Sequence, residues 1–438
     1  MKLLCSFKFE LYVDKPLRVA LSRNAGCRRF VFNKALALQN ERRQSGQKLL
    51  TYNELAAKLV LWKKDEATSF LKEAKSQPLQ QTLLDLDRAI QDSFRPKDDP
   101  AQKKWPKFKA RDAGDGFRIS QFKPSDIDDA NGRVKLPKIG WVRYRRTRPI
   151  AFRNADGTLT RGIVKQIHVS KDCGHWFVVF TTEFEIEPPQ MKSAEIGIDI
   201  GVVHAVALSD GRFFDLDTDK LKKIEERIAV LQRKLSLNLS ARKKLAENGL
   251  AKPFDKYKPG RKRRRLKERI QKLHRRMRCI RQDFQRKTAH ALAQEYGCVY
   301  AEDLKTKNMT KSAKGTVENP GTKVKRKSGL NRAILRTGFY GLTQAVAWQL
   351  VKTGGILEKV NPAHTSCLCP TCGCCDKRNR PKQAVFHCIV CGHHQNADTV
   401  GALNVLRKGR TGPSAHVKKR LFGGMCGLNR SIRYPRGG

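Results

Sequence analysis

Acidic residues are scarce in this chain, and their scarcity restricts what the protein can bind. Its 438 residues include 41 Asp and Glu against 90 Lys and Arg, which gives a formal net charge of +49. A compact surface with so little negative charge repels itself, so it is best explained as a surface that faces a polyanion, with nucleic acid as the leading candidate. An anionic membrane would favour a dominant basic amphipathic helix with a large apolar face, and the sequence has none.

Long apolar runs are missing as well. No stretch approaches the roughly 18 consecutive apolar residues of a membrane span, and residues 1–8 return to charge too early for the core of a signal peptide. We therefore expect an intracellular protein without a membrane partner. Thiols stay reduced inside cells, so cysteine clusters indicate metal binding there rather than disulfides. Internal repeats are also absent, and the length suits roughly two to four domains.

Cysteines, by contrast, are concentrated in one short segment. Seven of the 13 cysteines lie between positions 367 and 391. Four of them form two C-x-x-C units separated by 15 residues, Cys369 with Cys372 and Cys388 with Cys391. Four thiolates at this spacing predict one structural zinc ion with tetrahedral coordination. Three others, Cys367, Cys374 and Cys375, leave the ligand set open, and unrelated buried thiols or a disulfide framework are the plainer alternatives.

The first half of the chain alternates between strand and helix patterns. Residues 1–13 alternate apolar and polar side chains as a strand does, the spacing from 17 to 93 is helical, and residues 100–190 favour strands again. This order predicts a β-module that is split by a helical insertion. Basic residues alternate with aromatic rings at 103–109 and 141–146, which suits phosphate contacts and base stacking; an ordinary exposed basic face is the alternative.

After Pro188-Pro189 the pattern changes to buried strands and long helices. Apolar residues recur every three or four positions over 221–235 and 266–284, which predicts an antiparallel helical hairpin around a loop with Pro253 and Pro259. Its second helix has 14 Lys or Arg among residues 261–287. Arg263, Arg264 and Arg265 are therefore candidate phosphate contacts, and a solvated charged face is the alternative.

The remaining segments are shorter. The sequence predicts a strand over 298–301, a mobile loop over 311–331, a helix over about 331–353, a strand over 355–360, a helix over 398–408 and a loosely ordered basic tail from 409.

Three of the few acids stand at the ends of predicted elements. Asp199 ends the first buried strand, Glu302 ends the strand over 298–301, and Asp398 opens the last helix. Carboxylates at strand ends of an open α/β sheet point into the crevice where ligands bind. Three converging acids repel one another unless divalent cations lie between them, which predicts two Mg²⁺ ions and a two-metal phosphodiesterase. Individually, Asp199 is equally explained as a turn residue and Asp398 as a helix cap.

Several motifs of this chain resemble those of one family. They are Gly197-Ile198-Asp199-Ile200-Gly201, Ala301-Glu302-Asp303-Leu304, Thr365-Ser366, and Asn396-Ala397-Asp398 through Ala402-Leu403-Asn404, with the segments from Gly26 to Leu36 and from Ser76 to Gln81 nearer the N-terminus. Together they resemble TnpB, a family of transposon-encoded, RNA-guided nucleases related to compact type V CRISPR effectors. The resemblance extends to about residue 408.

The resemblance implies an α/β fold plus a β-barrel. A RuvC-like (RNase H-type) nuclease domain would carry an inserted zinc ribbon, and an N-terminal wedge β-barrel would be interrupted by a helical recognition lobe. The implied boundaries are 1–15 and 101–190 for the wedge barrel, 16–100 for the recognition lobe, 191–361 for the nuclease domain with a helical hairpin at about 219–290, 362–397 for the zinc ribbon as a target nucleic-acid-binding element, 398–408 for the closing segment of the nuclease domain, and 409–438 for the tail.

The resemblance also implies an activity and partners. The chain would be an RNA-guided DNA endonuclease that hydrolyses phosphodiester bonds with Asp199, Glu302 and Asp398. Its partners would be a guide RNA from the transposon end and a double-stranded DNA target beside a short motif, in the cytoplasm of a prokaryote and on its nucleoid. Tyr52, Ser76 and Gln80 are the implied contacts to that motif. The sequence does not predict the oligomeric state.

Two departures from the family pattern lie near these sites. Cys367 stands where the family usually carries Gln, and Val400 and Gly401 replace the usual Asn and Ala, which alters the surroundings of the metal site. A guide-dependent DNA-binding protein that does not cut is one alternative, although such a protein has no use for three clustered acids. A zinc-ribbon accessory of a transposase that acts without RNA is another, and a compact CRISPR effector is a third.

Overall fold

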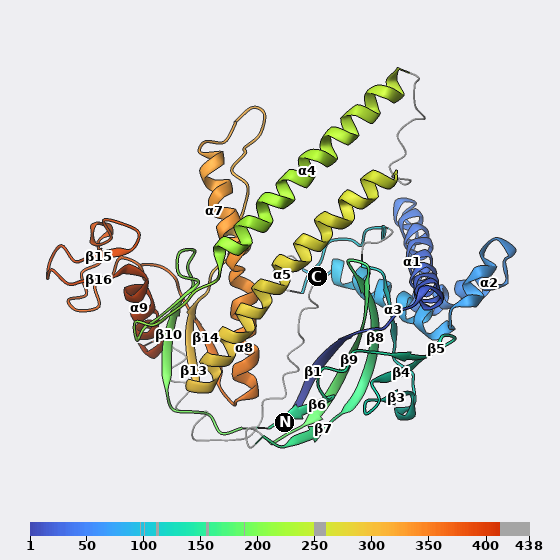
Figure 1. Ribbon diagram of the computed structural model, residues 1–438, viewed down its shortest axis with the longest axis horizontal. Coiled ribbons are helices and arrows are strands. Elements are labelled where there is room, and N and C mark those ends of the chain that lie inside the picture. The colour runs from blue at the N-terminus through green and yellow to red at the C-terminus, as the bar shows by residue number, and fades with distance from the viewer. Residues whose placement is uncertain are drawn as a thin grey trace. The chain divides into compact units, whose positions relative to one another are not determined.

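The computed structural model describes residues 1–96, 98–99, 101–110, 114–154, 157–187, 189–248 and 260–411, and it divides the chain into two compact units, Met1–Pro188 and Pro189–Gly438 (Figure 1). The predicted hairpin loop with Pro253 and Pro259, and the tail beyond residue 411, lie outside the described residues. Both units combine helices and strands, so the protein is of the mixed α/β class. Among the described helices, none is long and apolar enough to cross a membrane.

The first unit is built on a four-stranded antiparallel sheet in the order β1-β9-β8-β2. Its strands are β1 (Lys2–Glu10), β2 (Gly116–Ile119), β8 (Ile163–Asp172) and β9 (His175–Glu185). Alternate side chains of β1, from Leu3 to Phe9, are buried while those between them are exposed, apart from the half-buried Glu10 at its end. This period of two is what the sequence predicts for residues 1–13.

Smaller sheets complete the strands of this unit. They are β3 (Ile127–Asp128), β4 (Arg133–Leu136) and β5 (Gly140–Arg143) in one sheet, and β6 (Ala151–Arg153) with β7 (Leu159–Arg161) in another, with a short helix η2 (Pro124–Asp126) before β3. An isolated bridge between Leu11 and Tyr144 connects the ends of β1 and β5. A closed wedge barrel stays a prediction, because the described strands are assigned to separate sheets.

The helical insertion consists of α1 (Lys15–Gln44), α2 (Tyr52–Lys64), η1 (Glu66–Glu73) and α3 (Ser76–Ser93). Asp14 caps α1 by accepting a hydrogen bond from the Leu17 backbone, and Thr51 and Glu54 form a reciprocal capping box at α2. Apolar side chains of these helices, among them Leu36, form one buried cluster.

The second unit is organised around a five-stranded mixed sheet in the order β12-β11-β10-β13-β14. The strands are β10 (Glu195–Asp199), β11 (Val206–Leu208), β12 (Phe213–Phe214), β13 (Cys298–Glu302) and β14 (Ile356–Val360). β10, β13 and β14 run parallel, whereas β11 and β12 are antiparallel to their neighbours.

Helices cover both faces of this sheet. Val299 and Ala301 of β13 pack with residues of α5 (Arg261–Glu295) and α8 (Phe339–Lys352). Cys298 and Tyr300, which point to the opposite face, pack with Val405 of α9 (Ala397–Thr411). A strand buried on both faces is continuously apolar, which explains the unbroken apolar run before Glu302.

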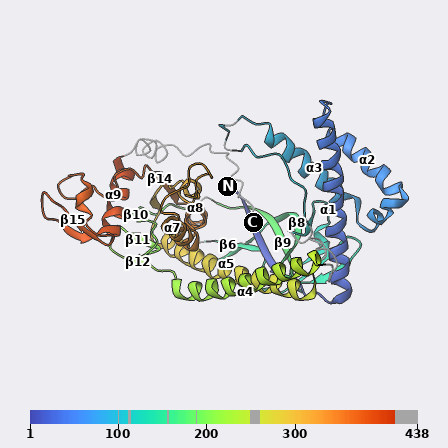
Figure 2. The same cartoon turned by 90° about the horizontal axis from the view of Figure 1, so that it is seen from above.

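The predicted helical hairpin is α4 (Thr218–Glu247) followed by α5, and the two helices lie side by side (Figure 1, Figure 2). Leu221, Ile224 and Ile228 of α4 form a buried cluster with Met277 of α5. These are positions of the apolar stripes that predict the hairpin.

Two predictions for residues 311–353 are wrong. The single helix predicted over about 331–353 is two helices, α7 (Val324–Thr337) and α8, because Gly338 adopts a left-handed φ of 71° that ends the first helix. The loop predicted over 311–331 is helical from Val324 onward, and a short helix α6 (Thr306–Met309) precedes it. The cysteine-rich segment contains η3 (Lys377–Asn379) and the strands β15 (Val385–His387) and β16 (His394–Asn396), which form a hairpin.

Candidate carboxylate and cysteine sites

Asp199 and Glu302 lie at the carboxyl ends of adjacent parallel strands. The register of β10 and β13 pairs Ile198 with Ala301, so the next residue on each strand is one of the two acids. Alternation places Glu302 on the same face as Cys298 and Tyr300, which is the face that α9 covers. Asp199 lies on that face too, because a Cβ built at Gly401 of α9 would lie 2.7 Å from Asp199 Oδ2.

Asp398 reaches the same place from the first turn of α9. Asn396, not Asp398, caps this helix: its side-chain oxygen accepts hydrogen bonds from the backbone N–H of Asp398 (2.9 Å) and Thr399 (3.3 Å). Asp398 and Gly401 are three residues apart and share one helix face. The helix contact at Gly401 therefore brings the carboxylates of Asp398 and Asp199 near each other.

The electrostatics of the site place the charges of Glu302 and Asp398 close enough to act on Asp199. Burial, and then the charges of Glu302 and Asp398, raise the pKa of Asp199 to about 7, although Arg380 opposes the shift. Burial also raises the pKa of Glu302, against the opposing effects of Thr365 and Lys408. Arg380 and Lys408 therefore offset only part of the shift that burial imposes on these two acids.

Two of these acids, Glu302 and Asp398, are bound by residues from the cysteine-rich segment and from the loop before it. The Thr365 hydroxyl donates a hydrogen bond to Glu302 Oε1, and Arg380 Nη2 lies 3.0 Å from Asp398 Oδ1. Asn404 of α9, which is fully buried, donates to the carbonyls of Thr365 (2.8 Å) and Leu368 (2.7 Å). In the sequence, Thr365 and Asn404 are indicated only as members of family motifs. Arg380 is not indicated at all, because its contact with Asp398 depends on the fold.

The carboxylate site fits a divalent cation by its chemistry. Its donors are hard oxygens with an excess of negative charge, which suits Mg²⁺. The ligand oxygens of the three acids are not all within 4.8 Å of one another. In the described part of the chain, only two groups of three or more His, Cys, Asp or Glu side chains meet that distance, and both contain cysteines. Carboxylates that hold two ions do not need that spacing, because each acid contacts the ions rather than the other acids.

The first cysteine set is the predicted one, Cys369, Cys372, Cys388 and Cys391. Sγ atoms of Cys369 and Cys391 are 3.6 Å apart, and those of Cys372 and Cys388 are 3.5 Å apart. Two sulfurs bound tetrahedrally to one zinc lie about 3.8 Å apart, since each Zn–S bond is about 2.3 Å. The backbone N–H of Cys391 lowers the pKa of the Cys388 thiol to about 6, whereas burial and the neighbouring thiols raise the pKa of Cys391 to about 12, so the four sulfurs share their protons. This set could therefore hold a metal ion such as zinc.

The candidate nucleic-acid contacts lie on helices. Tyr52 begins α2, and Ser76 and Gln80 lie one turn apart on α3, where the Ser76 hydroxyl accepts a hydrogen bond from Lys63 Nζ (2.8 Å). Arg263, Arg264 and Arg265 lie in the first turns of α5, and the last two are exposed. The structure does not test these contacts.

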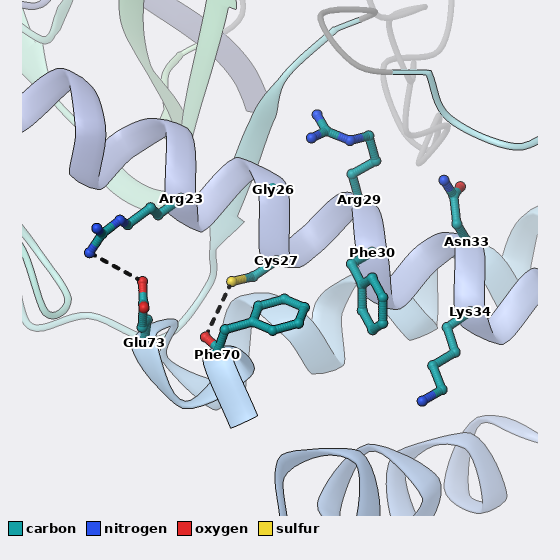
Figure 3. Close-up of a pocket in the computed structure, with 9 residues that line it drawn as sticks. All are labelled: Arg23, Gly26, Cys27, Arg29, Phe30, Asn33, Lys34, Phe70 and Glu73. Atoms are coloured by element: carbon teal, nitrogen blue, oxygen red, sulfur yellow. Dashed lines mark hydrogen bonds and ion pairs between the residues drawn. The ribbon is translucent and has the colours of Figure 1, made fainter. Parts of the chain in front are cut away.

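A cavity of about 760 Å³ lies along α1 in the first unit, within the segment from Gly26 to Leu36 and beside η1 (Figure 3). The rings of Phe30 and Phe70 meet edge to face there, 5.1 Å apart. Asn33 exchanges two hydrogen bonds with the Lys109 backbone, and Arg29 pairs with Asp115. These two residues of the motif thus attach α1 to the chain before β2, a structural role.

Three family models match different parts of the chain. A family described as a probable transposase matches residues 178–313, a Cas12f1-like TNB domain matches 339–405, and a helix-turn-helix domain matches 1–48. In the last range the structure has β1 and the single helix α1.

Two relatives are similar over nearly their whole length. The "Putative RNA-guided DNA endonuclease InsQ" of Escherichia coli (strain K12) is 39% identical over 410 residues, 93% of each chain. A similarly named protein of Streptomyces pristinaespiralis is 27% identical over 407 residues, which cover 92% of this chain and 89% of that protein.

Solved structures are more distant. A Cas12f1–sgRNA–target DNA complex is 14% identical with a TM-score of 0.31, over 93% of this chain and 100% of that chain. CasPhi-2 bound to crRNA and phosphorothioate-DNA is 14% identical with a TM-score of 0.39, over 93% of this chain and 92% of that chain.

Proposed function

The chain belongs to the TnpB family of transposon-encoded, RNA-guided nucleases, and from that premise we propose that it is an RNA-guided DNA endonuclease. The observation that carries the proposal is the proximity of three carboxylates in the second unit: Asp199 and Glu302 lie at strand ends on one face of the sheet, and Asp398 lies on α9, which covers that face. We propose that this sheet and its helices form a RuvC-like, RNase H-type nuclease domain.

The three acids would hold two Mg²⁺ ions. The chemistry supplied by bound Mg²⁺ at such a site is activation of a water and stabilisation of the charge on the scissile phosphate. Thr365 would orient Glu302 through its hydroxyl, and Arg380 would fix Asp398. Both residues act through an acid, so they are positioning residues.

The remaining parts would bind nucleic acid. The net charge of +49 suits an RNA–DNA partner, and the exposed Arg264 and Arg265 of α5 would contact phosphates, which position a nucleic acid without reading its sequence. The sequence would be read by base pairing with a guide RNA from the transposon end. Residues 16–100 would form the lobe that reads the short motif beside the target, with Tyr52, Ser76 and Gln80 as contacts. Residues 1–15 and 101–190 would form the wedge domain.

The test begins with the RNA. The protein is purified with its bound RNA, the RNA is sequenced, and cleavage of a matching double-stranded DNA is measured with and without Mg²⁺. We expect cleavage to require the RNA, Mg²⁺ and the flanking motif together. Specific cleavage by RNA-free protein at physiological salt would contradict the guided activity and favour a transposase accessory.

Variants of the acids test the site itself. Asp199→Ala, Glu302→Ala and Asp398→Ala should each abolish cleavage while RNA-dependent DNA binding persists, because the basic surface is unchanged. Asp303→Ala is the matched control: Asp303 is adjacent to Glu302, but its carboxylate pairs with Lys305 (2.5 Å) and Lys359 (3.2 Å). Normal cutting by any of the three variants would remove that residue from the site.

A further inference from the structure

Three metal-binding side chains lie together outside the four-cysteine set. They are His364, Cys367 and Cys375, and their ligand atoms all lie within 4.8 Å of one another. The Sγ atoms of Cys367 and Cys375 are 3.5 Å apart, and Cys367 Sγ is 3.9 Å from His364 Nδ1. None of the three belongs to the first set or to the carboxylate site.

These distances match those around a tetrahedral zinc ion. Bond lengths of about 2.3 Å to sulfur and about 2.0–2.1 Å to nitrogen separate two sulfurs by about 3.8 Å and a sulfur from a nitrogen by about 3.6 Å. The sulfur separation in this cluster, 3.5 Å, is the same as that between Cys372 and Cys388 in the first set. Two thiolates and an imidazole are ligands that favour zinc.

The backbone holds the three side chains in place. An isolated bridge pairs Leu368 with Cys375, which brings the segments of both cysteines side by side. Asn379, whose side chain is fully buried, donates to the carbonyls of Cys367 (3.0 Å) and Cys374 (3.1 Å). These bonds fix the separation of the two cysteine segments.

His364 is held in a conformation that non-glycine residues avoid. Its φ is 62°, in the left-handed region, where a side chain is sterically disfavoured. Its carbonyl accepts backbone hydrogen bonds from Cys367 (3.4 Å) and Leu368 (3.2 Å), which fold the loop back toward Cys367. The strained turn is what places the imidazole beside the two sulfurs.

We propose that His364, Cys367 and Cys375 bind a second Zn²⁺ ion, with the fourth coordination position open to solvent. His364 and Cys375 are exposed and Cys367 is half-buried, so an ion there can be reached from outside. The site has three protein ligands, whereas structural zinc sites have four. It should therefore exchange its ion faster than the four-cysteine set.

Zinc content of the full-length protein tests this site. The protein is saturated with Zn²⁺, freed of excess ion and measured by elemental analysis. We expect two zinc ions per chain in the wild type, and one in Cys375→Ser and in His364→Ala. Cys374→Ser is the matched control, because this cysteine is adjacent to Cys375 but belongs to neither set, and it should keep both ions.

A competing chelator gives a second measurement. Zinc should leave the wild type in two phases, and the fast phase should be missing from Cys375→Ser. One zinc ion per wild-type chain would overturn the proposal without reference to any variant. So would a Cys367–Cys375 disulfide in the zinc-treated protein, detected as a chain two hydrogens lighter with both thiols resistant to alkylation.

Discussion

Thr365 offers the sharpest test of how the carboxylate site is held. Its hydroxyl lies within hydrogen-bonding distance of Glu302 Oε1 and of the Pro362 carbonyl (2.9 Å), and its side chain is buried. A hydroxyl has one proton to donate, and a charged carboxylate is the stronger acceptor, so the ionised Glu302 receives it. Thr365→Val keeps the shape of the side chain and removes the proton.

The expected loss follows from that single bond. A hydrogen bond to a charged group contributes about 1.5–3 kcal/mol, and each ~1.4 kcal/mol is a factor of ten. Thr365→Val should therefore lower cleavage by roughly 10- to 100-fold at limiting Mg²⁺, as is usual when a partner of a metal ligand is lost. Added Mg²⁺ should restore part of the rate, because a weakened ligand raises the concentration needed to fill the site.

The assay is single-turnover cleavage of a labelled target by the protein–RNA complex over a range of Mg²⁺ concentrations. DNA binding is measured in parallel without Mg²⁺, where the variant should match the wild type. Thr365→Ser retains the hydroxyl and should recover most of the rate. If Thr365→Val cut as fast as Thr365→Ser at limiting Mg²⁺, the hydrogen bond would have no part in positioning Glu302.

Four further substitutions test single residues. Arg380→Ala should lower the melting temperature in Mg²⁺-free buffer without chelator, by the equivalent of about 1–3 kcal/mol for a lost charged partner. The loss should be smaller in Mg²⁺, because the cation replaces the charge that Arg380 presents to Asp398. Gly338→Ala should lower the free energy of unfolding, measured by urea titration, by about 1–2 kcal/mol, because the left-handed φ of 71° disfavours a side chain and the added Cβ would lie 2.8 Å from Arg281 Cδ. Gly329→Ala, with nothing within 4 Å of the added Cβ in α7, should raise the free energy of unfolding by about 0.5–1 kcal/mol. Arg264→Ala should reduce the salt dependence of nucleic-acid binding by the RNA-free protein, with a log–log slope smaller by about one; an unchanged slope would mean that Arg264 contacts no phosphate.

Periodic segments could be predicted from the sequence because their burial pattern is local. The alternation in residues 1–13 is β1, and the apolar stripes over 221–235 and 266–284 belong to α4 and α5. The break at Gly338 could not be predicted, since a glycine within an apolar helix pattern is also tolerated without a break. Only its φ distinguishes the two cases.

For the candidate site, the sequence predicted the three acids but not all of the residues that contact them. Strand ends and the helix start indicated the three acids, because those positions are local features. Arg380 was not indicated, since its pairing with Asp398 spans 18 residues and depends on how the cysteine-rich segment folds. The sequence showed that Cys367 and Cys375 exceed the needs of one zinc site. It did not indicate His364, because a left-handed turn that has no sequence pattern brings this residue close to the two cysteines.

The cysteine-rich segment and the carboxylate site form one connected structure. Arg380, between the two C-x-x-C units, holds Asp398, and Thr365, just before the first unit, holds Glu302. Asn404 of α9 donates hydrogen bonds to the carbonyls of Thr365 and Leu368 and so connects α9 to the same loop. Ions bound by the cysteines would therefore fix the loops that position two of the three acids without contacting either acid. In this chain the cysteine-rich segment lies between Glu302 and Asp398 in sequence, and these contacts give that order a physical reason.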